Sequence, residues 1–181
     1  KIFSMALENE KVVGISIGTR PDCVDEKILD LIEQVFKGKD VWIELGVQSS
    51  HERTLQKINR NHTFAHTTRA IQLIKERGFF VCTHLIIGLM GESFNDMAET
   101  IDAVNHFKVH GVKLHLLSVT KGSQLEKEHM KNPIHLFSED EYVDTIIELL
   151  RRLSKDIIVQ RLAGGGRPDV HIEPHWLLRS N

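Results

Sequence analysis

Short apolar runs rich in β-branched residues alternate along the chain with segments whose apolar residues recur at helical spacing, and this alternation most constrains the fold. Strands are predicted at residues 12–17, 41–47, 79–87, 112–119 and 157–162. Helices are predicted between them, at residues 25–36, 65–77, 93–110 and 138–153. Strands and helices that alternate with short connections indicate right-handed crossovers on a parallel sheet. The sequence therefore predicts an α/β fold of parallel strands with flanking helices.

The size and charge of the chain restrict its organisation. Its 181 residues, 41% of them hydrophobic, suffice for one globular core. We divide the chain into four β/α units over residues 1–155 and a carboxyl-terminal extension with a glycine-rich loop over residues 156–181. Four or five units are too few to close an eight-stranded barrel. The formal net charge of -2 gives no overall basic field that would indicate nucleic acid.

Cysteine usage and hydropathy bear on the compartment. The two cysteines, Cys23 and Cys82, are far apart and do not resemble a disulfide framework, which favours a reducing cytoplasm. No apolar run approaches the ~20 residues of a membrane span, so we expect no membrane association. The first residues lack the order of a signal peptide and run directly into a predicted strand. We therefore expect an earlier part of the protein to precede them.

Polar side chains gather where the first two predicted strands end, which is where ligands bind in parallel α/β proteins. Thr19 and Arg20 follow the first strand, and the guanidinium of Arg20 suits a carboxylate. Gln48 and Ser49 follow the second strand, and Arg60 lies in the next loop as another carboxylate clamp. The alternatives are that Arg20 is an ordinary surface residue and that Gln48 and Ser49 only cap the following helix.

Two strands carry polar residues within apolar sequence. By alternation Glu44 shares a face with Trp42 and Gly46, so it is expected to point into the barrel and to need a partner. His84 lies inside the third strand, where a hydrogen-bonded core histidine is the more common outcome than a ligand. Gly88 begins a tight turn that lets the backbone approach a flat ligand such as adenine, although ordinary strand-to-helix turns look the same.

The later strands supply candidates for a substrate pocket. His115 is predicted to face inward on the fourth strand, where an unused histidine would be costly. Lys121 follows on the next loop. Arg161 begins a glycine-rich segment, residues 161–169, which lacks the lysine and helix of a P-loop and is interpreted as a mobile substrate loop. These three residues are the substrate-pocket candidates.

Other kinds of site find little support in the sequence. Eleven histidines occur, yet there is no H-E-x-x-H motif and no close cysteine and histidine cluster. His62 and His66 are four residues apart, a spacing that is more often a solvated helix surface. No G-x-S-x-G elbow of a serine hydrolase is present. We therefore expect no metal ligands and no Ser-His-Asp triad in this chain.

Six ordered segments together carry a family resemblance. They are GISIGTRPD (14–22), VWIELGVQS (41–49), INRNH (58–62), HLIIGLMGE (84–92), LHLLSVTKG (114–122) and RLAGGGRPD (161–169). The chain resembles radical S-adenosylmethionine (radical SAM) proteins of the Fe-S oxidoreductase type, with a core similar to that of the Elongator catalytic subunit and of coproporphyrinogen dehydrogenase. The resemblance implies a partial TIM-like (β/α)6 barrel, of which this sequence is the carboxyl-terminal part from the third strand onward.

The resemblance also implies roles for individual residues. Gln48 matches the position that contacts the nucleoside ribose, and Arg60 matches the arginine that meets the methionyl carboxylate. His84 falls where relatives often carry an aspartate for the ribose hydroxyls, and Ile87 belongs to the backbone segment beside the adenine. The expected cofactor contacts are Thr19, Arg20, Glu44, Gln48, Ser49, Arg60, His84, Ile87 and Gly88.

Two departures from the family pattern stand out. Met90 replaces the proline of the family's G-L-P-G-E turn, and the C-x-x-x-C-x-x-C loop that holds a [4Fe-4S] cluster is absent. We therefore interpret the chain as a carboxyl-terminal fragment that is inactive alone. The intact enzyme would take electrons from flavodoxin or ferredoxin and cleave S-adenosylmethionine to a 5′-deoxyadenosyl radical. Its substrate is expected to be a tRNA wobble uridine or a small molecule that is dehydrogenated. The alternative is a non-catalytic module that binds a nucleoside or RNA.

Overall fold

A five-stranded parallel sheet forms the centre of the protein. A computed structural model describes residue 7, residue 9, residues 11–164 and residues 166–179. The strand order is β1-β2-β3-β4-β6, and every neighbouring pair is parallel. The strands are β1 (Gly14–Thr19), β2 (Asp40–Gln48), β3 (Phe80–Ile87), β4 (Gly111–Leu116) and β6 (Ile158–Arg161). The predicted α/β fold is confirmed.

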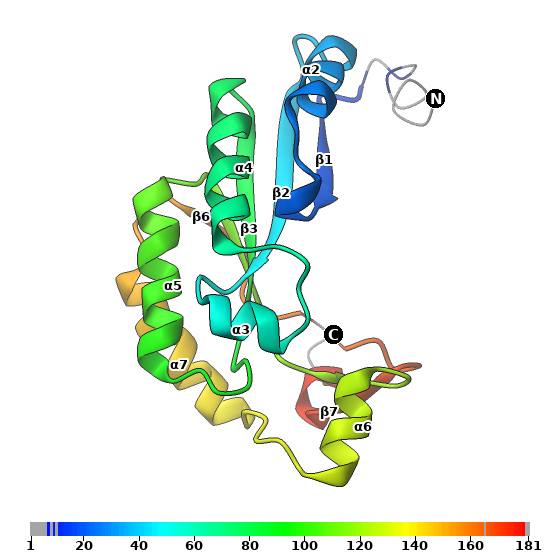
Figure 1. The fold of residues 1–181 in the computed structure, drawn as a ribbon, viewed down its shortest axis with the longest axis vertical. Helices are drawn as coiled ribbons and strands as arrows, with labels where there is room; N and C mark the ends of the chain where they lie inside the picture. Colours follow the sequence, from blue (N-terminus) through cyan, green and yellow to red (C-terminus); the bar gives the residue numbers. More distant parts are fainter. Residues whose placement is uncertain (1–6, 8, 10, 165, 180–181) are drawn as a thin grey trace.

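Helices connect consecutive strands, and α4, α5 and α7 lie along one side of the sheet (Figure 1). The helices are η1 (Pro21–Cys23), α2 (Glu26–Val35), α3 (Glu52–Lys57), α4 (Phe64–Glu76), α5 (Phe94–Phe107), α6 (Gln124–Lys131), α7 (Glu139–Arg152) and η2 (His175–Leu178). Thr63, Ser93 and Ser138 begin α4, α5 and α7 with capping boxes. Among the described residues, no helix combines the length and apolar character that crossing a bilayer requires.

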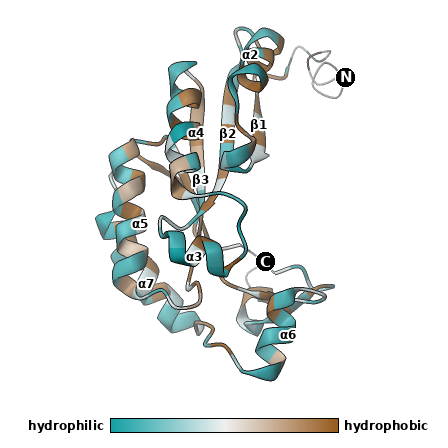
Figure 2. Ribbon diagram, in the orientation of Figure 1, coloured by the Kyte–Doolittle hydropathy of each residue, from teal (hydrophilic) through white to brown (hydrophobic). Residues whose placement is uncertain are grey.

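The strands present two different faces because successive side chains point in opposite directions. On β2, Val41, Ile43, Leu45 and Val47 are all buried, whereas the residues between them are only half-buried. The buried set packs with the apolar stripes of α2, α4, α5 and α7 into one core. In Figure 2 the strands are coloured mostly brown to white, whereas the helices alternate teal with brown along their length. The half-buried set forms the inner face of the partial barrel.

The carboxyl-terminal residues differ from their predicted arrangement. β4 ends at Leu116, and Val119–Thr120 forms the separate strand β5, which pairs antiparallel with β7 (His171–Glu173). Together with α6 this small sheet stands beside the carboxyl ends of the main strands (Figure 1). β6 pairs with β4 although it lies beyond residue 155, where we divided the chain. The sheet therefore extends past that division.

Candidate functional site

Glu44 occupies the middle of the inner face and receives three hydrogen bonds. Ser16 Oγ donates to its Oε1 at 2.5 Å, and Lys113 Nζ donates to its Oε2 at 2.5 Å. His84 Nε2 lies 2.6 Å from the same Oε2. Burial alone would raise the pKa of Glu44, but the hydrogen bonds from Lys113, Ser16 and His84 outweigh it and lower the pKa to about 2. The inward direction and the partner expected for Glu44 are both present.

His115 extends this polar cluster along β4. Its ring stacks on that of His84, with centroids 5.2 Å apart and planes 22° from parallel. Its Nε2 is buried and has no hydrogen-bond partner in the described part of the chain. Burial and the positive charges of His84, Arg161 and Lys113 lower the pKa of His115 to about 4, so the ring is neutral at pH 7.

The other two substrate-pocket candidates are placed differently. Arg161 pairs in register with Lys113, and its charge contributes to the lowered pKa of His84 and of His115. In the described residues, its guanidinium has no ion pair or hydrogen bond. Lys121 is exposed between β5 and α6, where its backbone N–H donates to Val170 O. The structure thus brings Arg161 to the polar cluster but shows no contact between the cluster and Lys121.

The glycine-rich segment lies against His115. A Cβ at Gly164 would stand 2.9 Å from His115 Nδ1, which is closer than real Cβ contacts come. A side chain at this position would therefore displace the imidazole. Gly165 lies outside the described residues, and the predicted mobility of residues 161–169 stays a prediction.

A cavity of about 320 Å³ opens at the carboxyl ends of β2 and β3. Its wall includes Gln48 and Ile86 from β2 and β3, Arg60 from the loop after α3, Leu117 from the segment after β4, and Leu125 and Glu128 from α6. Its volume and its apolar walls with a few polar groups are typical of a small-molecule site. The contribution of α6 was missed from the sequence, because that helix carries no motif and reaches the rim only through the small sheet.

Gln48 enters this cavity from a strained position. Its φ of 69° is in the left-handed region, which side chains other than glycine seldom adopt. The β2–β3 register shifts between Gly46 and Gln48, so a bulge ends the regular pairing here. Any Cβ on Gly46 would meet Gln48 Nε2 at 2.9 Å and Arg60 Nη2 at 3.0 Å. Because Gly46 has no side chain, Gln48 and Arg60 have room to pass it and reach the cavity.

Arg60 is a partly buried guanidinium without an acidic partner among the described residues. Its Nη2 donates to Gly46 O at 3.0 Å, while its Nε is buried and makes no hydrogen bond in the described part of the chain. Burial and the nearby charge of Arg20 lower the pKa of Arg60. An unsatisfied cationic donor at a cavity wall is suited to an anionic ligand group.

Arg20 and Ser49 are already engaged within the protein. Arg20 forms a two-bond ion pair with Asp22, at 3.0 and 2.7 Å, and Thr19 ends β1 just before it. Ser49 is fully buried, donates to Glu92 Oε1 at 2.5 Å and accepts from the backbone N–H of His51. Its hydroxyl therefore neither caps α3 nor faces the cavity.

The turn after β3 reaches the cavity through Leu89 and Met90. Ile87 is buried in the core, and Gly88 has a φ of 80°. Gly88 N–H lies 3.4 Å from Met97 Sδ. Gly88 therefore adopts the left-handed conformation that glycine tolerates, and neither Ile87 nor Gly88 lines the cavity.

The two cysteines do not fit an iron-sulfur cluster. Cys82 is buried, and burial together with the charge of Glu44 raises its pKa to about 12, so it is a thiol. Cys23 is exposed beside β1. Cluster iron requires several thiolates, and neither cysteine lines the cavity that holds Arg60 and Gln48.

Comparison with known proteins agrees with this geometry. Residues 1–104 match the radical SAM superfamily, and residues 109–181 match the Radical_SAM C-terminal domain. An uncharacterized protein of Methanocaldococcus jannaschii is 38% identical over 180 residues, which are 98% of this chain and 56% of that protein. A tRNA uridine(34) acetyltransferase of Methanocaldococcus infernus is 31% identical over 139 residues, which are 75% of this chain and 26% of that protein.

A solved structure shows the same arrangement of elements. The Elp3 protein of Methanocaldococcus infernus, with an amino-terminal deletion, superposes with a TM-score of 0.80 at 25% identity, over 89% of this chain and 38% of that one. The chain spans just over half the length of the similar uncharacterized protein of Methanocaldococcus jannaschii. The matches, the parallel partial barrel and the rim cavity agree, and the chain belongs to the radical SAM superfamily.

Proposed function

We propose that this chain provides the S-adenosylmethionine-binding and substrate-facing part of a radical SAM enzyme whose cluster ligands lie elsewhere in a longer protein. The observation that supports it most directly is Arg60, a partly buried guanidinium without an acidic partner among the described residues, at the wall of a cavity of about 320 Å³. S-adenosylmethionine carries a carboxylate and a nucleoside, and the cavity offers groups for both. The extra length of the relatives leaves room for the cluster-binding segment.

Each rim residue has a role in this proposal. Arg60 binds the methionyl carboxylate, and Gln48 binds a ribose hydroxyl. The backbone of Ile87 and Gly88 lies beside the adenine. Glu44 and His84 hold each other through their 2.6 Å contact and form the polar floor of the nucleoside site. When bound, S-adenosylmethionine supplies the 5′-deoxyadenosyl group of the radical reaction.

The chain alone is proposed to be inactive, because its two cysteines cannot hold a cluster. In the longer protein, a flavodoxin or ferredoxin would supply the electron that cleaves S-adenosylmethionine. Anaerobic reconstitution of this chain with iron and sulfide is expected to give no cluster absorbance and no cleavage product. The appearance of both would contradict the proposal.

Calorimetry with S-adenosylmethionine tests the binding role. The protein is expected to bind it weakly without iron, and Arg60→Gln is expected to weaken binding about 10- to 100-fold, because a charged hydrogen bond is lost. Arg69→Gln is the matched control, since Arg69 is exposed on α4 away from the cavity. Equal affinities for the Arg60→Gln and Arg69→Gln variants would contradict the proposed contact. Tight iron-independent binding by the unmodified protein would instead favour a non-catalytic nucleoside-binding module.

For the substrate, we favour a tRNA wobble uridine. A relative of this chain is named as a tRNA uridine(34) acetyltransferase, which supports this choice of substrate. Lys113, His115 and Arg161 add support because they bring cationic or hydrogen-bonding groups to the inner face. Overall charge adds no support, since the formal net charge is -2.

Nucleoside profiling of a strain that lacks the gene tests the substrate. We expect one modified uridine of tRNA to disappear, and we expect the complete gene with Arg161→Gln to restore it less well than the unmodified gene. Lys155→Gln, an exposed change after α7, is the control and should restore it fully. An unchanged set of tRNA nucleosides would favour the dehydrogenation of a small molecule.

A further inference from the structure

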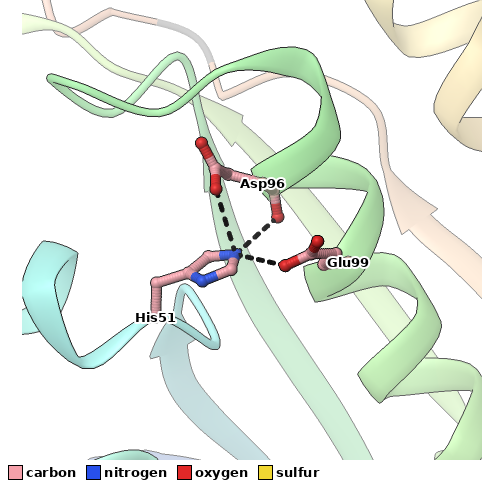
Figure 3. Close-up of side chains that lie close together, drawn as sticks. All are labelled: His51, Asp96 and Glu99. Carbon is pink, nitrogen blue, oxygen red and sulfur yellow. Dashed lines mark hydrogen bonds and ion pairs between the residues drawn. The ribbon is translucent and has the colours of Figure 1, made fainter.

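Three side chains outside the candidate site converge at the amino-terminal end of α5. His51 comes from the residue before α3, whereas Asp96 and Glu99 come from the first two turns of α5 (Figure 3). One ligand atom from each residue lies within 4.8 Å of the other two. We propose that these three residues form a divalent cation site for a metal of the zinc class.

The distances suit a single small ion. His51 Nε2 lies 3.8 Å from Asp96 Oδ1 and 3.5 Å from Glu99 Oε2. Ligands bound at the usual zinc distances stand ~3.4 Å apart in a tetrahedron. Small side-chain movements therefore bring the three atoms onto one ion, with a fourth position left for water.

The imidazole of His51 donates from Nε2 to the backbone carbonyl of Asp96 at 3.0 Å, and the backbone around His51 is fixed as well. His51 N–H donates to Ser49 Oγ, and Ser50 makes two hydrogen bonds to Thr100 Oγ1 on α5, at 3.1 and 3.0 Å. The segment that carries His51 is thereby fixed to the helix that carries both carboxylates. Such support lowers the cost of assembling a metal site.

Asp96 has an oxygen available for this role. Its Oδ2 accepts from the N–H and the Oγ of Ser93, the N-cap of α5. Its Oδ1 accepts from Arg53 Nη2 at 2.5 Å and lies 3.8 Å from His51 Nε2. The hydrogen bonds from Ser93 and Arg53 lower the pKa of Asp96, which keeps it ionised. The Arg53 side chain is 59% exposed and can turn to solvent. A metal ion therefore competes with Arg53 for Oδ1 and with the hydrogen bond that His51 Nε2 donates to Asp96 O at 3.0 Å, and it leaves the helix cap intact.

Carboxylate and imidazole ligands together are typical of zinc sites with an open position. His51 and Asp96 are 45 residues apart, so no sequence motif indicates the cluster. His51 also follows Gln48 by three residues. An ion at this position would link the segment that follows β2 to α5. It would thereby stabilise the wall of the cavity to which Gln48 belongs.

Calorimetric titration of the protein with zinc chloride, in a buffer that does not bind metal, tests the site. We expect one ion per chain and a higher melting temperature. Glu99→Gln is expected to weaken binding about 10-fold or more through loss of a ligand charge. Arg53→Gln is expected to tighten it about 2- to 5-fold, since an exposed ion pair is worth up to about 1 kcal/mol.

His135→Ala is the matched control, because His135 is 69% exposed and lies near one carboxylate of its own. It should bind zinc like the unmodified protein, whereas His51→Ala should lose the ion. Circular dichroism checks that each variant is folded, and the exposed Glu99 and Arg53 keep the test valid if His51→Ala unfolds. Zinc binding that is equal in the Glu99→Gln, Arg53→Gln and unmodified proteins, or no binding at millimolar zinc, would overturn the proposal.

Discussion

Glu44 is the residue on which the inner face depends most. One carboxylate accepts from Ser16 and Lys113 and contacts His84, so a single side chain joins strands β1, β2, β3 and β4. Its side chain is only 15% exposed. Removing the charge would leave Lys113 without its partner in a poorly solvated place, which costs more than the loss of an exposed ion pair.

We predict that Glu44→Gln destabilises the protein by roughly 2 kcal/mol at pH 7. The lowered pKa of Glu44, about 2 when folded against 4.5 as the reference, means that its stabilisation is present above about pH 4.5 and is lost as the pH falls toward 2. The difference between the variant and the unmodified protein should therefore shrink below pH 4.5. Urea unfolding at pH 7 and at pH 3 measures it. Glu33→Gln, on the exposed side of α2, is the control, and a pH-independent difference would refute the linkage.

Single residues also show what the sequence could not decide at this site. The alternation along β2 was enough to predict that Glu44 points inward, because side-chain direction follows from local backbone geometry. Its partner Lys113 is 69 residues away, and only the register of β2, β3 and β4 brings the two together. Ser49 is a second example. Its hydroxyl donates to Glu92, which lies 43 residues further along the chain, and nothing in the local sequence indicates this contact.

The helices are the elements whose limits were most readily predicted. Ser138 and Glu141 form the expected capping box of α7: Ser138 Oγ accepts from Glu141 N–H at 3.2 Å, and Glu141 Oε2 accepts from Ser138 N–H at 2.8 Å. The motif is local, so four consecutive residues of sequence contain it. α6 is also a helix, but its position beside the cavity depends on the pairing of β5 with β7.

We predict that Ser138→Ala destabilises the protein by about 1 kcal/mol, because the first turn of α7 loses its side-chain acceptor. Ser138→Asp should retain nearly all of the stability, since aspartate also accepts at this position and favours the positive end of the helix dipole. Thermal and urea unfolding compare the two variants. Equal losses in both would mean that packing, and not the cap, makes Ser138 important.

At the scale of the whole molecule, the sequence by itself determined the parallel α/β architecture, the two faces of β2 and the residues that belong to the strand ends. These follow from periodicity and local chemistry, which neighbouring residues carry. Only the tertiary structure decided which polar groups meet. The Glu44 cluster, the α6 wall of the cavity and the His51, Asp96 and Glu99 group each join residues from separate elements. Strand register and helix packing set those contacts, and both arise from the burial of the whole core.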